Sequence, residues 1–202
     1  MERPTTGERL RREGAPTPPR QSASLIVVRD AAGGLELLLV RRNPAQRFMG
    51  GFWVFPGGAV DGAESHRAAA VRELAEEAGL EGIAPATLIE YSRWITPELI
   101  EIRFDTRFFL ARAPDGERAR VDGEECIDLR WTTPRAALAA YEDDELALVF
   151  PTLRHLEELA AFATVDELLA HARGREIRAI MPRVVLDGPR PRIVLPGEPG
   201  YA

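Results

Sequence analysis

Residues 64–78 form the clearest helical segment of the sequence. They are rich in alanine, glutamate, arginine and leucine, and they are followed by Gly79, a residue type that commonly ends helices. Most other apolar stretches, such as residues 25–28, are only long enough for strands. The chain is therefore predicted to combine one strong amphipathic helix with many short strands.

The remaining elements follow from apolar runs and turn signals. Residues 22–29 and 35–40, joined by the turn signal at residues 30–34, are predicted to form a hairpin. Further strands are predicted at residues 52–55, 88–95, 100–111 and 127–131. Helices are predicted at residues 134–141, 151–162 and 165–173. Residues 183–186 and 192–195 are predicted to pair as a terminal hairpin.

Length and composition limit the classes of protein to consider. The chain has 202 residues, enough for one core and a small appendage. Its net charge of −6 disfavours nucleic acid as a partner, and no apolar run approaches the roughly 20 residues that span a membrane. Cys126 is the only cysteine, which fits a reducing cytoplasm. Residues 1–21, polar and proline-bearing, are expected to be a disordered arm.

Three glutamates on the predicted helix need an explanation. Glu73, Glu76 and Glu77 have the spacing i, i+3 and i+4, and at about 100° per residue they fall opposite the apolar face of the helix. Like charges at this spacing repel one another. Either the cluster is an ordinary solvated face, or it binds a hard divalent cation such as Mg²⁺ or Mn²⁺.

The residues around the cluster favour the metal site. The segment from Gly58 to Leu80 fits the pattern G-x5-E-x7-R-E-U-x-E-E-x-G-U, in which U is a bulky aliphatic residue. The nine specified positions match, and they are Gly58, Glu64, Arg72, Glu73, Leu74, Glu76, Glu77, Gly79 and Leu80. This segment resembles the signature of the Nudix hydrolase family.

The resemblance implies both a fold and a chemistry. Nudix proteins share an α/β/α sandwich with a mixed β-sheet, and they cleave nucleoside-linked diphosphates by attack of water on phosphorus. By matched position, Glu73, Glu76 and Glu77 are the expected metal ligands, and they are also expected to be catalytic together with Arg72, which orients them. Gly58 is expected in a tight turn, with its carbonyl facing the metal.

A further carboxylate outside this signature is expected to assist catalysis. Glu124 and Glu125 follow the charged loop at residues 113–123, and Glu125 is the preferred candidate. The alternative is that both belong to a solvated acidic loop.

The segment before the signature resembles a pattern found in Nudix coenzyme A diphosphatases, L-L-T-x-R-[S/A]-x3-R-x3-G-x3-F-P-G-G. The matching residues are Leu38, Leu39, Arg42, Arg47, Gly51, Phe55, Pro56, Gly57 and Gly58, whereas Val40 and Asn43 depart from it. The resemblance implies that Arg42, Arg47, Gly57 and Gly58 bind substrate, with the arginines gripping phosphate. Surface ion pairs are the alternative for both arginines.

These observations predict one Nudix domain at residues 22–150 and a C-terminal extension at residues 151–202, packed on the domain or on a dimer partner. The expected reaction is metal-dependent hydrolysis of coenzyme A or acyl-CoA to 3′,5′-ADP and a 4′-phosphopantetheine. Family resemblance suggests a homodimer. The alternatives are a hydrolase for ADP-ribose, a dinucleotide or an oxidised nucleotide, and a Nudix sensor that binds a nucleotide without turnover.

Overall fold

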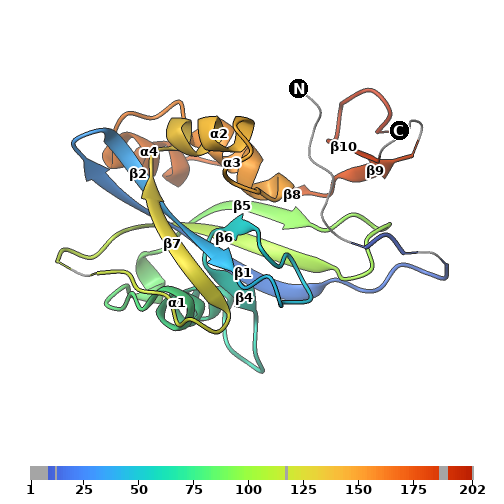
Figure 1. Ribbon diagram of the computed structural model, residues 1–202, viewed down its shortest axis with the longest axis horizontal. Coiled ribbons are helices and arrows are strands. Elements are labelled where there is room, and N and C mark those ends of the chain that lie inside the picture. Colours follow the sequence, from blue (N-terminus) through green and yellow to red (C-terminus); the bar gives the residue numbers. More distant parts are fainter. Residues whose placement is uncertain (1–8, 12, 117, 187–190, 202) are drawn as a thin grey trace.

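The computed structural model describes residues 9–11, 13–116, 118–186 and 191–201, and Figure 1 shows their arrangement. A mixed β-sheet forms the middle layer, with the strand order β3-β2-β1-β6-β5-β8; β4 pairs with β1, and β7 with β2. The strands are β1 Arg20–Ala31, β2 Gly34–Arg42, β3 Trp53–Val54, β4 Gly57–Ala59, β5 Ile89–Ile95, β6 Phe104–Arg112, β7 Cys126–Thr132 and β8 Ala179–Ile180.

Strand direction makes the sheet mixed. β1 runs parallel to β6 and β5 runs parallel to β8, whereas the other neighbours are antiparallel. The predicted hairpin of residues 22–29 and 35–40 is confirmed, because β1 and β2 pair antiparallel with Val28 opposite Leu37. β1 lies in the interior of the sheet, and its apolar run from Leu25 to Val28 is fully buried.

Helices cover both faces of the sheet (Figure 1). Helix α1, His66–Ala78, lies on one face, where Ala70 and Leu74 join Leu25 and Val27 of β1 in one apolar cluster. Helices α2 Pro134–Glu142, α3 Phe150–Leu159 and α4 Val165–Arg173 lie on the other face. A short 3₁₀ helix, η1 Pro85–Thr87, precedes β5. These layers confirm the predicted α/β/α class.

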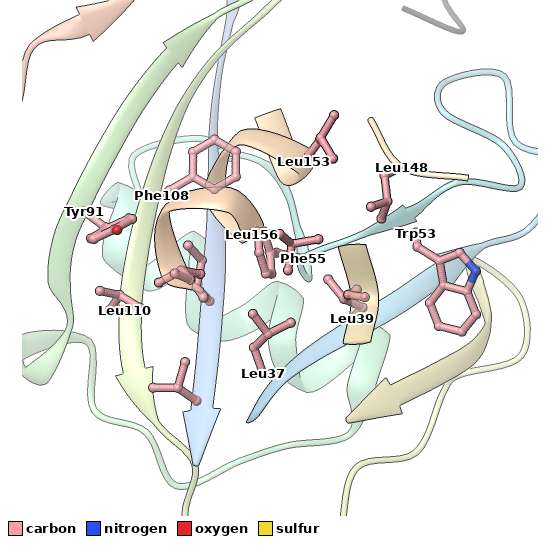
Figure 2. Close-up of a cluster of buried hydrophobic side chains, with 14 of the residues drawn as sticks. Leu37, Leu39, Trp53, Phe55, Tyr91, Phe108, Leu110, Leu148, Leu153 and Leu156 are labelled. Carbon is pink, nitrogen blue, oxygen red and sulfur yellow. The ribbon is translucent and has the colours of Figure 1, made fainter. Parts of the chain in front are cut away.

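The larger apolar cluster fills the layer beneath α3. Figure 2 shows Leu37, Tyr91 and Phe108 of the sheet converging on Leu153 and Leu156 of α3. Burial of each such leucine or aromatic side chain stabilises the fold by about 1.5–3 kcal/mol. The C-terminal helices thus share one core with the sheet.

The C-terminal hairpin is also present as predicted. Strands β9 Arg183–Val185 and β10 Arg192–Val194 pair antiparallel, with Ile193 opposite Val184. The Tyr201 hydroxyl donates a hydrogen bond to the Met181 carbonyl at 2.7 Å, which fastens the end of the chain to the segment before β9.

Two predicted segments have other boundaries in the structure. The strand predicted from residue 100 begins at Phe104, because a turn closed by the hydrogen bond from Ile100 N–H to the Pro97 carbonyl occupies the preceding residues. β1 begins at Arg20, and Leu10 forms a β-bridge with Ile100, so part of the expected disordered arm is ordered. Residues 1–8 and 12 of that arm lie outside the described residues.

Within the part of the chain that the structure describes, no helix has both the length and the apolar character needed to cross a membrane.

Candidate active site

Helix α1 is fixed at both ends by local interactions. The Ser65 hydroxyl caps the N-terminus by accepting from Ala68 N–H at 3.2 Å. Gly79 ends the helix with φ 59°, and its N–H donates to the Ala75 carbonyl. Only glycine adopts this left-handed conformation without strain, which explains the glycine at this position of the signature.

The predicted placement of the glutamates on this helix was partly wrong. Glu76 is exposed as expected, but Glu73 and Glu77 are only 9% and 1% exposed and lie on the buried side with Leu74 and Ala78. The helix buries a wide arc because β4 covers the side that the periodicity assigns to solvent, as the hydrogen bond from Gly57 N–H to Glu77 Oε2 shows. The cluster is therefore largely an interior feature.

Arg72 contacts three glutamates of the signature. Its Nη1 donates to Glu73 Oε1 and Glu76 Oε2, both at 2.8 Å, and its Nη2 donates to Glu64 Oε1 at 2.8 Å. These hydrogen bonds, chiefly the one to Glu64, raise the pKa of Arg72 further. A planar guanidinium with fixed donors can hold several carboxylates in one orientation.

Glu77 is the most deeply buried carboxylate of the cluster. Its Oε2 accepts from Gly57 N–H at 2.9 Å, and its Oε1 accepts from Arg42 Nη1 at 3.2 Å. The pKa of Glu77 is raised to about 7, chiefly by burial and also by the charges of Glu73 and Glu125, although the Gly57 hydrogen bond and the charge of Arg42 oppose the rise. Burial likewise raises the pKa of Glu73. The charges of Glu73, Glu77 and Glu125 thus repel one another, and the neighbouring arginines and the Gly57 N–H only partly offset the cost of burying Glu73 and Glu77.

Gly57 and Gly58 let the backbone pass close to these groups. Gly58 belongs to β4 and pairs with Ala23, so the expected tight turn is not found there. A Cβ on Gly58 would lie 2.3 Å from Glu73 Oε1, and a Cβ on Gly57 would lie 2.5 Å from the Ala23 carbonyl. Any side chain at position 58 would displace the Glu73 carboxylate.

A β-bulge sets the place of Arg42. The register between β2 and β7 shifts between Arg41 and Arg42, so that Arg42 faces Cys126. Bulges of this kind redirect side chains. Here the guanidinium reaches Glu77 and the carbonyl of Phe48, to which Nε donates at 3.2 Å.

Arg47 lies apart from the carboxylates. Its side chain is 76% exposed and forms an ion pair with Glu101 at 3.5 Å. The surface ion pair considered for this residue is therefore present. Gly51, the glycine of the same motif, has φ 84°, a left-handed backbone conformation that favours glycine.

The loop before β7 brings Glu125 to the site. Asp122 accepts hydrogen bonds from the backbone N–H groups of Glu124, Glu125 and Cys126 and so forms the turn. Asp122 was not among the predicted site residues, although an Asp three residues before the candidate carboxylate is typical of such turns. Glu125 lines the cavity described below.

A cavity of about 410 Å³ joins these groups. Glu73, Glu125, Arg42, Gly57 and Gly58 line one part of it. Apolar side chains of β5, β6, α3 and the C-terminal segment line most of the remainder. Four predicted site residues, Arg47, Arg72, Glu76 and Glu77, do not line the cavity. Arg72 and Glu77 nevertheless contact residues of its lining, Glu73 and Arg42 respectively.

Comparison with known proteins decides the family. A family model described as the NUDIX domain matches residues 18–153, about two thirds of the chain. The chain belongs to the Nudix family. The crystal structure of a NUDIX hydrolase from Alicyclobacillus acidocaldarius superposes with a TM-score of 0.68 at 28% identity, covering 76% of this chain and 96% of that one. The Nudix assignment made from the signature is thereby confirmed.

Curated relatives of this Nudix protein carry different substrate names. The acyl-coenzyme A diphosphatase NUDT19 of Homo sapiens is 29% identical over 119 residues, 56% of this chain and 32% of the relative. The putative 8-oxo-dGTP diphosphatase of Bacillus subtilis is 32% identical over 114 residues, covering 56% and 66%. A CTP pyrophosphohydrolase of Escherichia coli is 37% identical over 101 residues, covering 50% and 70%. The chain thus spans about a third of the human relative.

Nudix hydrolases in general use divalent metal ions. The donor chemistry here fits one, because carboxylate oxygens suit hard cations and the side-chain-free Gly58 leaves space at Glu73. Among the described residues, no three acidic, His or Cys side chains form a ready metal-binding group. Both Glu77 oxygens accept hydrogen bonds, from Arg42 and Gly57, so a cation binds Glu77 only by displacing the Arg42 contact. Arg72 bonds only one oxygen of Glu73 and one of Glu76, so it can keep these contacts.

Proposed function

We propose that this Nudix protein hydrolyses the diphosphate of a nucleoside-linked metabolite with the help of a divalent cation. The observation that carries the proposal is that Glu73 and Glu125 line one cavity and that Glu77 contacts Arg42 and Gly57 of its wall, with raised pKa values for Glu73 and Glu77. Such a group of carboxylates attracts a cation and, through it, a diphosphate.

The chemistry assigns a separate task to each group. A cation held by Glu73, Glu76 and Glu77, Mg²⁺ or Mn²⁺, would neutralise the diphosphate and acidify a water. A water oxygen forms a bond to phosphorus, the bridging P–O bond breaks, and its electron pair leaves with the departing phosphate. Glu125, on the cavity wall, accepts the proton of the water.

Arginines complete the site in this proposal. Arg72 keeps Glu73 and Glu76 in position through its 2.8 Å hydrogen bonds. Arg42 lines the cavity and pairs with Glu77, so it is close enough to exchange that partner for a substrate phosphate.

The substrate that we favour is coenzyme A or acyl-CoA, cleaved to 3′,5′-ADP and a 4′-phosphopantetheine. The motif that contains Arg42 and Gly51 supports it, as does the name of the human relative. The contacts of Arg47 with Glu101 do not support a phosphate-binding role for that residue, so the assignment depends on Arg42.

A second candidate is hydrolysis of an oxidised nucleoside triphosphate or of CTP. The two bacterial relatives with these substrate names are more similar to this chain than the human one, at 32% and 37% identity against 29%. The two candidates share the site and the cation and differ only in the group beyond the diphosphate.

Incubation of the purified protein with Mg²⁺ or Mn²⁺ and equal concentrations of coenzyme A, acyl-CoA, ADP-ribose, 8-oxo-dGTP and CTP tests the proposal. Mass detection should find 3′,5′-ADP as the fastest-formed product. Faster release of a nucleoside monophosphate from 8-oxo-dGTP or CTP would favour the second candidate. Binding without any product would indicate a non-catalytic sensor instead.

Two properties of the whole protein belong to the same proposal. A homodimer is expected from the family resemblance, and light scattering on a size-exclusion column measures it. A reducing compartment such as the cytoplasm suits the lone Cys126, which is buried and whose pKa is raised by burial and by the charge of Glu77.

A further inference from the structure

The cavity beside the carboxylates has a second, apolar compartment. Its floor is one face of the sheet, where Phe104 and Phe108 of β6 lie next to Trp94 of β5. The floor also includes the Thr106 hydroxyl, which is hydrogen-bonded to the Ser22 hydroxyl of β1 at 2.6 Å.

The C-terminal extension contributes a wall of this compartment. Ile193 of β10 and Pro182, the residue before β9, line the cavity together with Phe150 and Pro151 of α3. Ile193 is only 3% exposed. Residues beyond the part matched by the Nudix family model therefore shape the space that a substrate can occupy.

A loop between β2 and β3 covers the compartment. Phe48 lies against Phe104 with ring centroids 4.9 Å apart, and both side chains line the cavity. The ion pair between Arg47 and Glu101 joins the same loop to the segment before β6. These contacts hold the loop beside the apolar compartment.

Three of the four charged side chains among the described lining residues, Arg42, Glu73 and Glu125, belong to the carboxylate end of the cavity. The fourth, Arg20, is exposed and pairs in the sheet with Phe104. A phosphorylated or heavily hydroxylated group placed among Phe104, Phe108 and Ile193 would lose more hydrogen bonds to water than the few polar groups there, the Trp94 indole N–H and the Thr106 hydroxyl, can replace. An uncharged aliphatic group would gain from burial there.

We propose that this compartment binds an uncharged, mainly aliphatic arm attached to the second phosphate of the substrate, and that Ile193 is a specificity-determining residue. The inference deepens the proposed diphosphatase function. It predicts that the nucleoside half of the substrate extends away from the compartment and that the aliphatic half enters it.

Two commercial compounds make a matched test. Dephospho-coenzyme A and ADP-ribose share the ADP half; the second group is the uncharged, largely aliphatic pantetheine arm in the former and a hydroxylated ribose in the latter. With Mn²⁺ and the full-length protein, kcat/KM for dephospho-coenzyme A should exceed that for ADP-ribose by at least tenfold. Equal values, or a preference for ADP-ribose, would overturn the proposal.

Substitutions in β10 then locate the effect. Ile193→Thr should lower the ratio of the two kcat/KM values about fivefold, because it removes apolar surface from the compartment and adds a hydroxyl. Val194→Thr is the matched control, since Val194 is equally buried in the same strand and does not line the cavity. An equal change of the ratio in both variants would mean that the hairpin acts only through stability.

Binding measurements test the apolar compartment even if the protein does not hydrolyse these compounds. If neither compound is cleaved, calorimetry of their binding to the metal-loaded protein still compares the two arms. Dephospho-coenzyme A binding at least tenfold more tightly would support the compartment, with Ile193→Thr reducing the difference. Equal affinities would contradict it.

Discussion

At the scale of single residues, the proposed metal site depends most on Glu77. It is 1% exposed and accepts hydrogen bonds from both Gly57 and Arg42. Two opposing effects decide the protonation state of Glu77. Burial favours the neutral acid, whereas the two donors favour the charged carboxylate. Charge at Glu77 therefore matters for both stability and function.

Glu77→Gln should lower turnover by at least a hundredfold, because the amide is a poor cation ligand. The helical periodicity places Glu77 opposite the apolar face, but the residue is buried. The fold is still expected to survive, since the amide oxygen can accept from Gly57 N–H. Steady-state kinetics and a circular dichroism melt measure both effects. Glu81→Gln, exposed and outside the site, should behave like wild type, and near-normal turnover of Glu77→Gln would remove this residue from the mechanism.

The pH dependence of stability tests the environment of Glu77. Its pKa is about 7 in the folded protein, against an ordinary value of 4.5, so between these pH values the folded state retains a proton that the unfolded state has lost. Metal-free protein should thus lose up to about 3 kcal/mol of unfolding free energy as the pH rises from 4.5 to 7. Denaturant titrations in EDTA should show this loss in wild type and a smaller one in Glu77→Gln; identical pH profiles would contradict the assignment.

At the scale of elements, α1 and its ends position the site. The helix itself was predictable from its composition and from Gly79, and the hairpin β1–β2 from its turn signal. Strand β4 was not predictable, because residues 57–59 include two glycines and show no apolar alternation. This strand forms only through its pairing with β1. Since β4 covers the side of α1 that carries Glu73 and Glu77, missing that strand also misplaced these residues.

Gly79→Ala should destabilise the protein by about 1 kcal/mol or more. The residue has φ 59°, and an added Cβ would lie 2.8 Å from Cγ of Arg120. Gly62→Ala is a matched control, because Gly62 has a similar φ of 52° and no atom within 4 Å of the added Cβ. Chemical denaturation should show the larger loss for Gly79→Ala. Equal losses would mean that backbone strain alone is responsible.

At the scale of the whole molecule, the sheet holds groups that are distant in the sequence around one cavity. The signature near α1 predicted the carboxylates, since their spacing is local. The sequence did not reveal that Arg42 would reach Glu77, because a bulge between β2 and β7 sets the register at Arg42. The ion pair of Arg47 with Glu101 depends on contact between two loops that are distant in the sequence. Nor did the sequence reveal that Ile193 would border the same space, since that contact depends on how the C-terminal hairpin packs.

The most direct measurement is calorimetric titration of Mn²⁺ into the metal-free protein, compared with the Glu73→Gln/Glu77→Gln double variant. Wild type should bind the ion with release of protons below pH 7, and the double variant should bind at least tenfold more weakly. Absence of binding by wild type, or equal binding by both proteins, would contradict the claim that these buried carboxylates form the metal site of this Nudix protein.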